Sequence, residues 1–444
     1  MNIGVIGSGG REHAICYKLK QSLKINKLYC IPGNAGTSEI SENIDIDTNS
    51  FEEIHKAVLE KQIDLLIVGP EIPLVNGIVD YFEKKKIKVF GPSKKASQIE
   101  GSKIFMKKIC EEFKIPSAKF KEINNINDAK NIITEFELPI VVKSDGLAYG
   151  KGVTICNSRE EAIDDISKIL NGKFSSSKKV IIEEFLKGEE ASYFVISDGN
   201  NFLPIGTAQD HKRIGENDTG LNTGGMGAYS PSFLINNEIE EKIKNKIIAP
   251  TIDGMKKKGI PFKGILYAGL MIYKSEPRLI EYNIRFGDPE CQVLMMRLEE
   301  DLLNLILSAV NNNLQKKKLN WSKEPGITIV AASKGYPEKY EKLYEITNLK
   351  QIKKNLKQQL FHAGTVKVND NILTNGGRVL NSTVIASSLS KARENALRIL
   401  DKIKYKNKYY RRDIGYKIID KWELYQENSK EKNYLYQKIK KLGH

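Results

Sequence analysis

Apolar runs alternate with amphipathic stretches along the first hundred residues. MNIGVIG precedes a helix that we expect from Arg11 to Leu23, and the alternation continues through KLYCI, SFEEIHKAVLEK, IDLLIVGP, NGIVDYFEKKK and IKVFGP. Strands and helices in this order predict a parallel, doubly wound sheet. Ligands of such sheets bind at the carboxyl ends of the strands. In this chain those ends carry the segments GSGGREH, PGNAG and GPE.

The rest of the pattern predicts an α/β protein of several domains. After the doubly wound unit at 1–102, apolar strands near IVVKSD, GVTIC and KVIIEEFL define a second unit at 103–190. A third unit at 191–325 contains glycine-rich and strand-like segments. A small α+β unit at 326–425 ends with a helix near LSKARENALRILDKI, and 426–444 is expected to form a charged helical tail.

Composition fits a multidomain protein with real cores. The chain has 444 residues, of which 40% are hydrophobic and 28% charged. No apolar run approaches the ~20 residues that span a bilayer. Met1 leads directly into a strand-like segment without a basic leader, so we expect a cytoplasmic protein without a membrane partner.

The cysteines and charges exclude several other classes of protein. The five cysteines show no C-x-x-C pair, so we expect buried, reduced thiols rather than disulfides or a zinc site. Lys and Arg exceed Asp and Glu by 15, but the surplus is spread over the whole chain. Because basic and aromatic residues do not interleave, we expect solvated lysine-rich faces and no nucleic-acid partner.

The segment GSGGREH places glycines at the start of a helix, where backbone N–H groups and the helix dipole bind phosphate. Arg11 adds a forked donor. Glu12 stands where a dinucleotide fingerprint needs its third glycine, so a phosphorylated sugar fits better than NAD. The alternative is a glycine turn that only packs a strand on a helix.

A second glycine-rich segment, KSDGLAYGKGV, lies between two expected strands and begins at Lys143. Its glycines and lysines suit a loop that closes over phosphates. It is not a Walker A motif, because no G-x-x-x-x-G-K-[ST] leads into a helix. The alternative is an ordinary flexible hairpin.

Two further segments carry candidate ligands. The apolar strand that reaches Glu183 ends in carboxylates, and its backbone can meet an adenine edge while Glu190 accepts ribose hydroxyls. In EYNIR, a strand period of two places Glu281, Asn283 and Arg285 on one face. Two oxygen donors suit Mg²⁺ and the guanidinium suits a substrate carboxylate. Solvated strand ends and a cross-strand salt bridge are the alternatives.

Taken in order, these segments resemble the ATP-grasp superfamily and, within it, the family of phosphoribosylamine–glycine ligases. The resemblance covers nearly the whole chain except the tail. It rests on GSGGREH, PGNAG, IVGPE, EGSK, KSDGLAYGKGV, IEEFLKGEEAS, QDHKR, NTGGMGAYSP, LYAGLMI, EYNIRFGDPE, FHAGT, NGGRVL and RRDIGY.

The resemblance implies ATP and Mg²⁺ (or Mn²⁺), with glycine and 5-phosphoribosylamine as substrates. The second and third units become the small and large ATP-grasp subdomains. The implied nucleotide contacts are Lys103, Lys143, Gly150, Lys151, Gly152, Glu183, Glu184, Phe185, Leu186, Glu190, Arg213 and Asn222. The implied metal ligands are Glu281 and Asn283, and the implied catalytic groups are Arg285, Asp288 and Lys143. The implied substrate contacts are Gly9, Gly10, Arg11, Asn34, Asp210, Gly225, Met226, Arg285, Gly287 and Asp288.

Departures from the family pattern are few and remove no donor or ligand. Ser144 and Tyr149 replace usual alanines, and Leu221 replaces a usual proline. Many ATP-grasp carboxylases carry a metal-binding glutamate where this chain has Gly269, which favours the glycine ligase over that branch. Another ATP-grasp ligase or carboxylase acting on a different purine intermediate and a nucleic-acid-binding protein are the competing hypotheses. We further expect a monomer that contacts the amidotransferase supplying phosphoribosylamine.

Overall fold

The computed structural model describes residues 1–147, 152–173, 179–315 and 318–419. Residues 148–151 of the predicted phosphate loop lie outside the described residues, among them Tyr149 and the implied nucleotide contacts Gly150 and Lys151. So does the predicted helical tail at 426–444. No helix among the described residues is long and apolar enough to cross a membrane.

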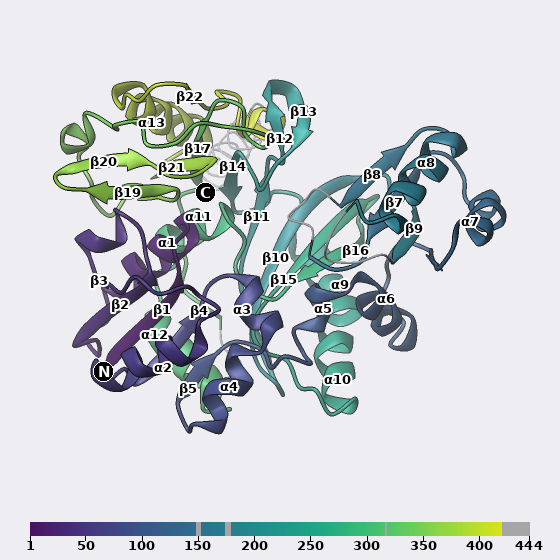
Figure 1. Ribbon diagram of the computed structural model, residues 1–444, viewed down its shortest axis with the longest axis horizontal. Coiled ribbons are helices and arrows are strands. Elements are labelled where there is room, and N and C mark those ends of the chain that lie inside the picture. The colour runs from purple at the N-terminus through teal and green to yellow at the C-terminus, as the bar shows by residue number, and fades with distance from the viewer. Residues whose placement is uncertain (148–151, 174–178, 316–317, 420–444) are drawn as a thin grey trace, which may run out of the picture.

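The N-terminal part forms the predicted parallel, doubly wound sheet (Figure 1). Its strand order is β3-β2-β1-β4-β5, with the spans β1 Asn2–Gly7, β2 Lys27–Pro32, β3 Glu42–Asn43, β4 Leu65–Val68 and β5 Lys88–Phe90. The accompanying helices are α1 Gly10–Leu19, α2 Phe51–Glu60, α3 Glu71–Asn76 and α4 Ile78–Lys84. The order confirms the α/β class expected from the alternating apolar runs.

Helix α1 is shorter than predicted, since it ends at Leu19 rather than Leu23. Leu23 is fully exposed. The intervening Ser22 hydrogen-bonds to Asp301 at 2.8 Å, a contact that fixes the chain outside the helix. A tertiary contact has therefore overridden a local helical pattern.

A small antiparallel sheet forms a lobe that projects from the rest of the molecule (Figure 1). Its order is β6-β9-β7-β8, with the spans β6 Phe120–Ile123, β7 Ile140–Ser144, β8 Val153–Cys156 and β9 Val180–Glu184. Helices α7 (Ile126–Ile132) and α8 (Arg159–Leu170) pack on it around a separate apolar core. Helices α5 (Gln98–Gly101) and α6 (Lys103–Glu112) connect the lobe to the N-terminal sheet.

One antiparallel sheet runs through both units expected at 191–325 and 326–425. Its order is β16-β15-β10-β11-β14-β17-β21-β18, and β22 pairs with β17 beside this path. The spans are β10 Glu189–Asp198, β11 Phe202–Asp210, β14 Gly227–Ser230, β15 Lys263–Tyr273, β16 Glu276–Asn283, β17 Gly326–Ser333, β18 Gln358–His362, β21 Arg378–Ile385 and β22 Lys408–Tyr409. The helices of this region are α9 Asn237–Ile243, α10 Ala249–Lys257, α11 Glu290–Arg297, α12 Leu302–Val310 and α13 Leu389–Lys402.

Two short hairpins stand apart from the large sheet. Strands β12 (Arg213–Gly215) and β13 (Thr219–Asn222) form one, and β19 (Thr365–Val368) and β20 (Asn371–Thr374) form the other. The first hairpin leads directly into the glycine-rich segment before β14, so its placement bears on the site.

The N-terminal sheet shares an apolar core with the large sheet. Ile15 and Leu65 of the N-terminal part belong to the same buried cluster as Phe286, Leu294 and Leu302. All five cysteines are buried and free, as predicted. The residues of the candidate site lie where the N-terminal sheet and the large sheet meet the lobe.

Candidate active site

Lys143 and Glu183 face each other across adjacent strands of the lobe. Lys143 Nζ lies 2.8 Å from Glu183 Oε2, because strands β7 and β9 pair antiparallel. Lys107 Nζ lies 3.4 Å from the other carboxylate oxygen and donates to the carbonyl of Ala118. All three side chains are buried. The ammonium group of Lys143 is therefore held in a fixed position on strand β7 of the lobe.

Lys103 reaches the start of the glycine-rich loop. Its ammonium donates to the carbonyl of Gly146 at 2.9 Å. Asp145 holds the beginning of α6, since Ser102 Oγ and the amide of Ile104 both donate to its carboxylate at 3.1 Å. Burial lowers the pKa of Lys103 below its usual value, although neighbouring carboxylates act in the opposite direction.

The predicted adenine segment lies at the end of β9. The amide of Lys119 donates to Glu184 Oε1 at 2.8 Å, so this carboxylate ties two parts of the chain together. Phe185 is exposed at 37%, which leaves its ring free to pack against a flat ligand. Leu186 is half-buried beside it. Glu190, expected to hold a ribose, pairs with Lys212 at 2.7 Å.

The predicted metal ligands lie on β16, next to strand β15. Glu281 pairs with Gly269, and Asn283 pairs with Tyr267. Burial favours a protonated Glu281, but the charges of Lys212 and Lys143 outweigh burial and lower its pKa. Within the described part of the chain, neither Glu281 nor Asn283 uses its side chain in a hydrogen bond or ion pair. Their oxygens are therefore free to accept a ligand.

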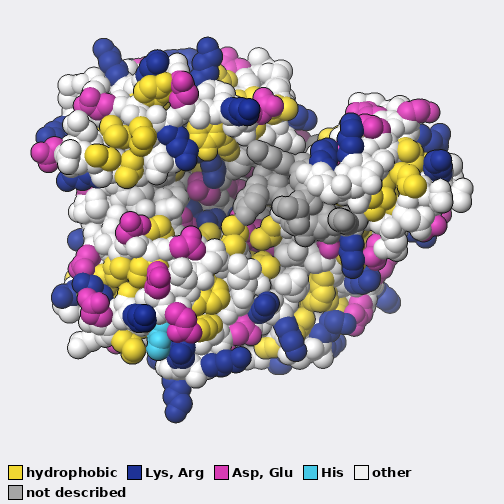
Figure 2. All heavy atoms as spheres, in the orientation of Figure 1, with side chains coloured by type: hydrophobic (Ala, Val, Ile, Leu, Met, Phe, Trp, Pro, Cys, Tyr) yellow, Lys and Arg dark blue, Asp and Glu magenta, His cyan; other side chains and the backbone are white. Residues whose placement is uncertain are grey.

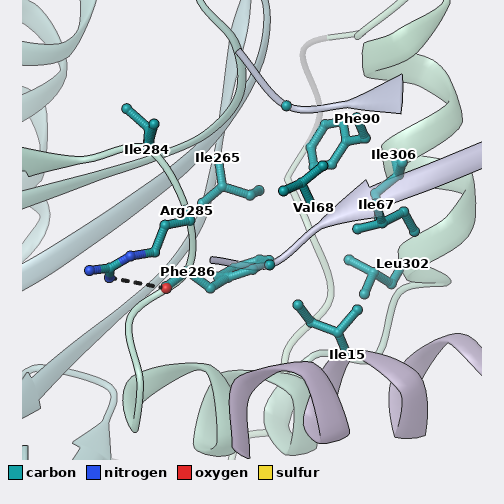
Figure 3. Close-up of a pocket in the computed structure, with 12 residues that line it drawn as sticks. Ile15, Ile67, Val68, Phe90, Ile265, Ile284, Arg285, Phe286, Leu302 and Ile306 are labelled. Carbon is teal, nitrogen blue, oxygen red and sulfur yellow. Dashed lines mark hydrogen bonds between the residues drawn. The ribbon is translucent and has the colours of Figure 1, made fainter. Parts of the chain in front are cut away.

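Arg285 lies beyond the end of β16, where two carboxylates hold it. Its Nε donates to Glu71 Oε2 at 3.1 Å and its NH2 donates to Glu100 Oε1 at 3.3 Å. Burial raises the pKa of Glu100 to about 7, although the charge of Arg285 acts in the opposite direction. Figure 3 shows the guanidinium pointing away from the apolar cavity that Ile67 and Phe286 help to line.

Asp288 receives contacts from two parts of the chain. Gln292 Nε2 donates to Asp288 Oδ1 at 2.8 Å, and Arg378 NH2 lies 3.4 Å from Asp288 Oδ2. Arg378 also donates to the carbonyl of Gly224 at 2.7 Å. Burial alone would raise the pKa of Asp288, but Arg378 and the other nearby guanidinium groups hold it below its usual value.

Two glycines of the predicted substrate set have no room for a side chain. A Cβ on Gly287 would come within 2.3 Å of the Glu290 carboxylate. A Cβ on Gly225, whose φ is +112°, would come within 2.5 Å of Pro289. The neighbouring Met226 is fully buried, and its amide donates to the carbonyl of His211. These backbone segments pack against each other at the centre of the candidate site.

Asp210 ends strand β11 close to these segments. Burial raises its pKa to about 7, although Lys212 acts in the opposite direction, and Glu290 raises the pKa further. Asp210 therefore changes its charge near neutral pH.

Figure 2 shows a hollow between the projecting lobe and the body of the molecule, with acidic and basic side chains inside it.

The residues predicted to face a ribose phosphate already contact other groups of the protein. Gly9 N–H donates to Glu12 Oε2 at 2.6 Å, and Arg11 donates to the carbonyl of Phe286 at 3.2 Å. Asn34 donates to the carbonyls of Ser8 and His362, both at 2.8 Å. Gly10 is packed so closely that a Cβ would meet amide groups of Gln292 and Asn381 within 2.5 Å. The phosphate role of these residues stays a prediction.

Arg213 and Asn222 lie opposite each other on the β12–β13 hairpin. Arg213 NH1 donates to the carbonyl of Gly220 across the same hairpin at 2.7 Å. Gly152, at the other end of the phosphate loop, accepts a hydrogen bond from the amide of Ser144. The structure thus brings the predicted residues to the edges of one region, and their individual roles remain predictions.

Four charged residues that the structure places among the predicted ones were given no role from the sequence pattern. They are Glu71, Glu100, Lys107 and Arg378. Glu71, Glu100 and Arg378 stand within the quoted motifs IVGPE, EGSK and NGGRVL, so their motifs were a usable signal. Lys107 follows Lys103 by four residues, which places both on one face of α6.

Comparison with protein families accounts for nearly all of the chain. Residues 1–100 match the phosphoribosylglycinamide synthetase N domain, 101–291 match its ATP-grasp (A) domain, and 326–417 match its C domain. Among curated proteins, the phosphoribosylamine–glycine ligase of Brucella melitensis is 46% identical over 95% of this chain and 99% of its own length. That of Haemophilus influenzae is 45% identical over 95% and 99%.

Solved structures give the same result for the fold. The phosphoribosylamine–glycine ligase of Thermotoga maritima has a TM-score of 0.82 at 32% identity, covering 93% of this chain and 100% of that one. A biotin carboxylase from Campylobacter jejuni reaches a TM-score of 0.72 at 14% identity, covering 94% and 95%, and at that identity shows the fold alone. The chain is an ATP-grasp carbon–nitrogen ligase and belongs to the phosphoribosylglycinamide synthetase family.

Proposed function

We propose that this protein joins the carboxylate of glycine to the amine of 5-phosphoribosylamine, using ATP and forming glycyl phosphate on the way. The observation that carries the proposal is the proximity of Lys103 and Lys143 to Glu281, on the segment that also carries Arg285 and Asp288. The chain matches the family over residues 1–100, 101–291 and 326–417. The products are glycinamide ribonucleotide, ADP and phosphate.

The chemistry proceeds in two transfers. A carboxylate oxygen of glycine attacks the γ-phosphorus of ATP, and the bond to the ADP oxygen breaks. The amine nitrogen then attacks the acyl carbon, inorganic phosphate leaves, and the nitrogen releases a proton. Phosphoryl transfer depends on positioning and charge neutralisation more than on covalent help from the protein. Lys143 and Lys103 supply positive charge at fixed positions for the first transfer.

Arg285 binds the glycine substrate. Two carboxylates fix its orientation, while its remaining N–H groups can hold the glycine carboxylate for the first transfer. Asp288 lies on the loop that follows Arg285, and Arg378 fixes it from the C-terminal part of the chain. The close approach of Gly225 to the Pro289 ring limits how far this loop can shift.

The residues present fit a hard divalent cation. Glu281 is kept ionised by surrounding lysines, and the amide oxygen of Asn283 is available next to it. The described residues contain no group of three or more His, Cys, Asp or Glu side chains arranged for a metal. Two protein oxygens match Mg²⁺ that is completed by nucleotide phosphates and water. Such an ion would neutralise charge that develops on the transferred phosphoryl group.

A side chain at position 269 would press on the metal site. A Cβ on Gly269 would approach Glu281 Cγ to 3.2 Å. This contact supports the glycine ligase over the carboxylase branch, in which a glutamate is expected at this position. Cytoplasmic location, a monomeric state and contact with the amidotransferase are further parts of the proposal.

The test is ADP release from Mg-ATP with glycine and freshly generated phosphoribosylamine, with each component omitted in turn. Alanine and bicarbonate replace glycine in parallel reactions. The proposal requires ADP and glycinamide ribonucleotide only when all three substrates are present. Turnover with a different acid or amine would leave the ATP-grasp ligase assignment intact and overturn the substrates.

A further inference from the structure

The β12–β13 hairpin has one partly buried apolar side chain against the C-terminal core, that of Ile214, while its Leu221 is exposed. It forms a two-stranded sheet separate from the large one, and its turn at Glu216–Asp218 has no buried residue. Asn217 and Asp218 adopt left-handed backbone conformations, with φ of 56° and 55°. These conformations are uncommon for residues other than glycine and need support from the surrounding structure.

That support comes from residues 409–417, which we call the C-terminal strap. Tyr409 Oη donates to the carbonyl of Ile214 at 2.9 Å, and the amide of Arg412 donates to Glu216 at 3.1 Å. Lys417 pairs with Asp218 at 2.6 Å. The strap therefore fastens strand β12 and the turn of the hairpin, although 195 residues separate Tyr409 from Ile214 in sequence.

Arg411 lies at the centre of this contact and is fully buried. Its Nε and NH2 bind both oxygens of Asp413 at 2.8 and 2.7 Å. Its NH1 donates to Asp218 at 2.9 Å and to the carbonyl of Arg213 at 3.0 Å. Asp413 in turn accepts the amide of Asn217 at 2.7 Å. A single guanidinium thus connects the strap, the hairpin turn and the backbone of Arg213.

The geometry of these bonds suits arginine alone. A bidentate pair with one carboxylate, together with two bonds from the remaining nitrogen, requires the planar guanidinium fork. A lysine ammonium keeps the charge but supplies a single nitrogen. Replacing Arg411 by Lys therefore preserves the charge of the cluster while loosening either the strap or the hairpin.

We propose that Arg411 is a positioning residue for the nucleotide, which acts through Asp218 and the backbone of Arg213 to hold the hairpin beside the ATP site. This inference rests on the proposed function and on the contacts with ATP that the resemblance to the family implies for Arg213 and Asn222. It adds that the C-terminal part of the chain sets the affinity for nucleotide, although none of the implied nucleotide contacts lies beyond Asn222.

The experiment compares Arg411→Lys and Asp218→Asn with Arg412→Lys as the matched control. The Arg412 side chain is half exposed and pairs with Asp401, so its replacement leaves the hairpin contacts in place. Binding of Mg-ATP is measured by calorimetry without acid or amine substrate, and KM for ATP and for glycine is measured in turnover. Thermal denaturation reports the folded fraction of each variant.

We expect Kd and KM for ATP to rise about tenfold or more in Arg411→Lys and Asp218→Asn, as the loss of a charged hydrogen bond implies. KM for glycine should stay within about twofold, and Arg412→Lys should match the wild type. The double variant should be less affected than the sum of the single ones, because both changes break one connection. Hydrogen exchange at 213–222 should become faster in both variants.

Wild-type affinity for Mg-ATP in folded Arg411→Lys and Asp218→Asn protein would overturn the inference. So would a loss of binding that only follows the unfolded fraction, since that is what a general structural role produces. If the wild type binds Mg-ATP but does not ligate glycine to phosphoribosylamine, the proposed function fails. The calorimetric comparison then still decides the role of Arg411.

Discussion

Replacing Asn34 by Ala separates two roles for this residue. Its amide group donates to the carbonyls of Ser8 and His362 and accepts the amides of Gly36 and Thr37, with distances from 2.8 to 3.0 Å. The substitution leaves these four backbone groups without their partner in a buried region. At about 0.5–1.5 kcal/mol for each net hydrogen bond, the loss of unfolding free energy should be about 2–6 kcal/mol.

The assay is urea unfolding followed by circular dichroism, combined with hydrogen exchange at Gly36 and Thr37. Asn26→Ala is the control, because Asn26 is exposed and makes one side-chain contact at 3.3 Å. It should change stability by less than about 0.5 kcal/mol. If Asn34→Ala is as stable as this control while KM for phosphoribosylamine rises, Asn34 binds substrate as the resemblance implies, and the structural reasoning is refuted.

Three further substitutions test other parts of the site. Glu281→Gln should lower kcat by about a hundredfold or more and leave the melting curve unchanged, because it removes a charged metal ligand. Normal turnover over a Mg²⁺ titration would exclude Glu281 from the metal site. The control is Glu276→Gln, at the exposed start of β16. The pKa of Glu100 is raised to about 7, so the folded state holds that proton more tightly than the unfolded chain. Stability should therefore fall as pH rises from about 4.5 to 7, by roughly 3 kcal/mol at most. Glu100→Gln should flatten this fall in urea unfolding at several pH values, and an unchanged slope would refute the shifted pKa. Phe185→Ala should raise KM for ATP about fivefold to tenfold by removing apolar contact with the adenine. KM for glycine is the internal comparison. An unchanged KM for ATP would place adenine elsewhere.

Local patterns predicted the strands and the residues at their ends. Alternation of apolar and amphipathic segments was sufficient for the N-terminal parallel sheet, and the pairing of two apolar strands brought the side chains of Lys143 and Glu183 together on a diagonal. Both results depend on burial of neighbouring segments, which leaves a periodic signal in the sequence.

Long-range contacts were beyond these patterns. Arg285 was expected on the same strand face as Glu281, but β16 ends at Asn283 and its pairing with β15 is irregular near Gly269. Its partner Glu71 is 214 residues away in the sequence, and no local period encodes such a contact. The same applies to Arg411, whose partners become visible only when the C-terminal strap meets the hairpin.

The large sheet shared by 191–325 and 326–425 has a consequence for dissecting the protein. Strand β17 pairs with β14 on one side and with β21 on the other. A chain cut after residue 325 would leave unpaired the N–H and C=O groups of β14 that face β17, and would uncover Met226 and Tyr229, which pack into the C-terminal core. An unpaired strand edge next to uncovered apolar side chains is a template for other chains. The first three quarters of the sequence should therefore aggregate when expressed alone, and the C-terminal part is not a detachable module.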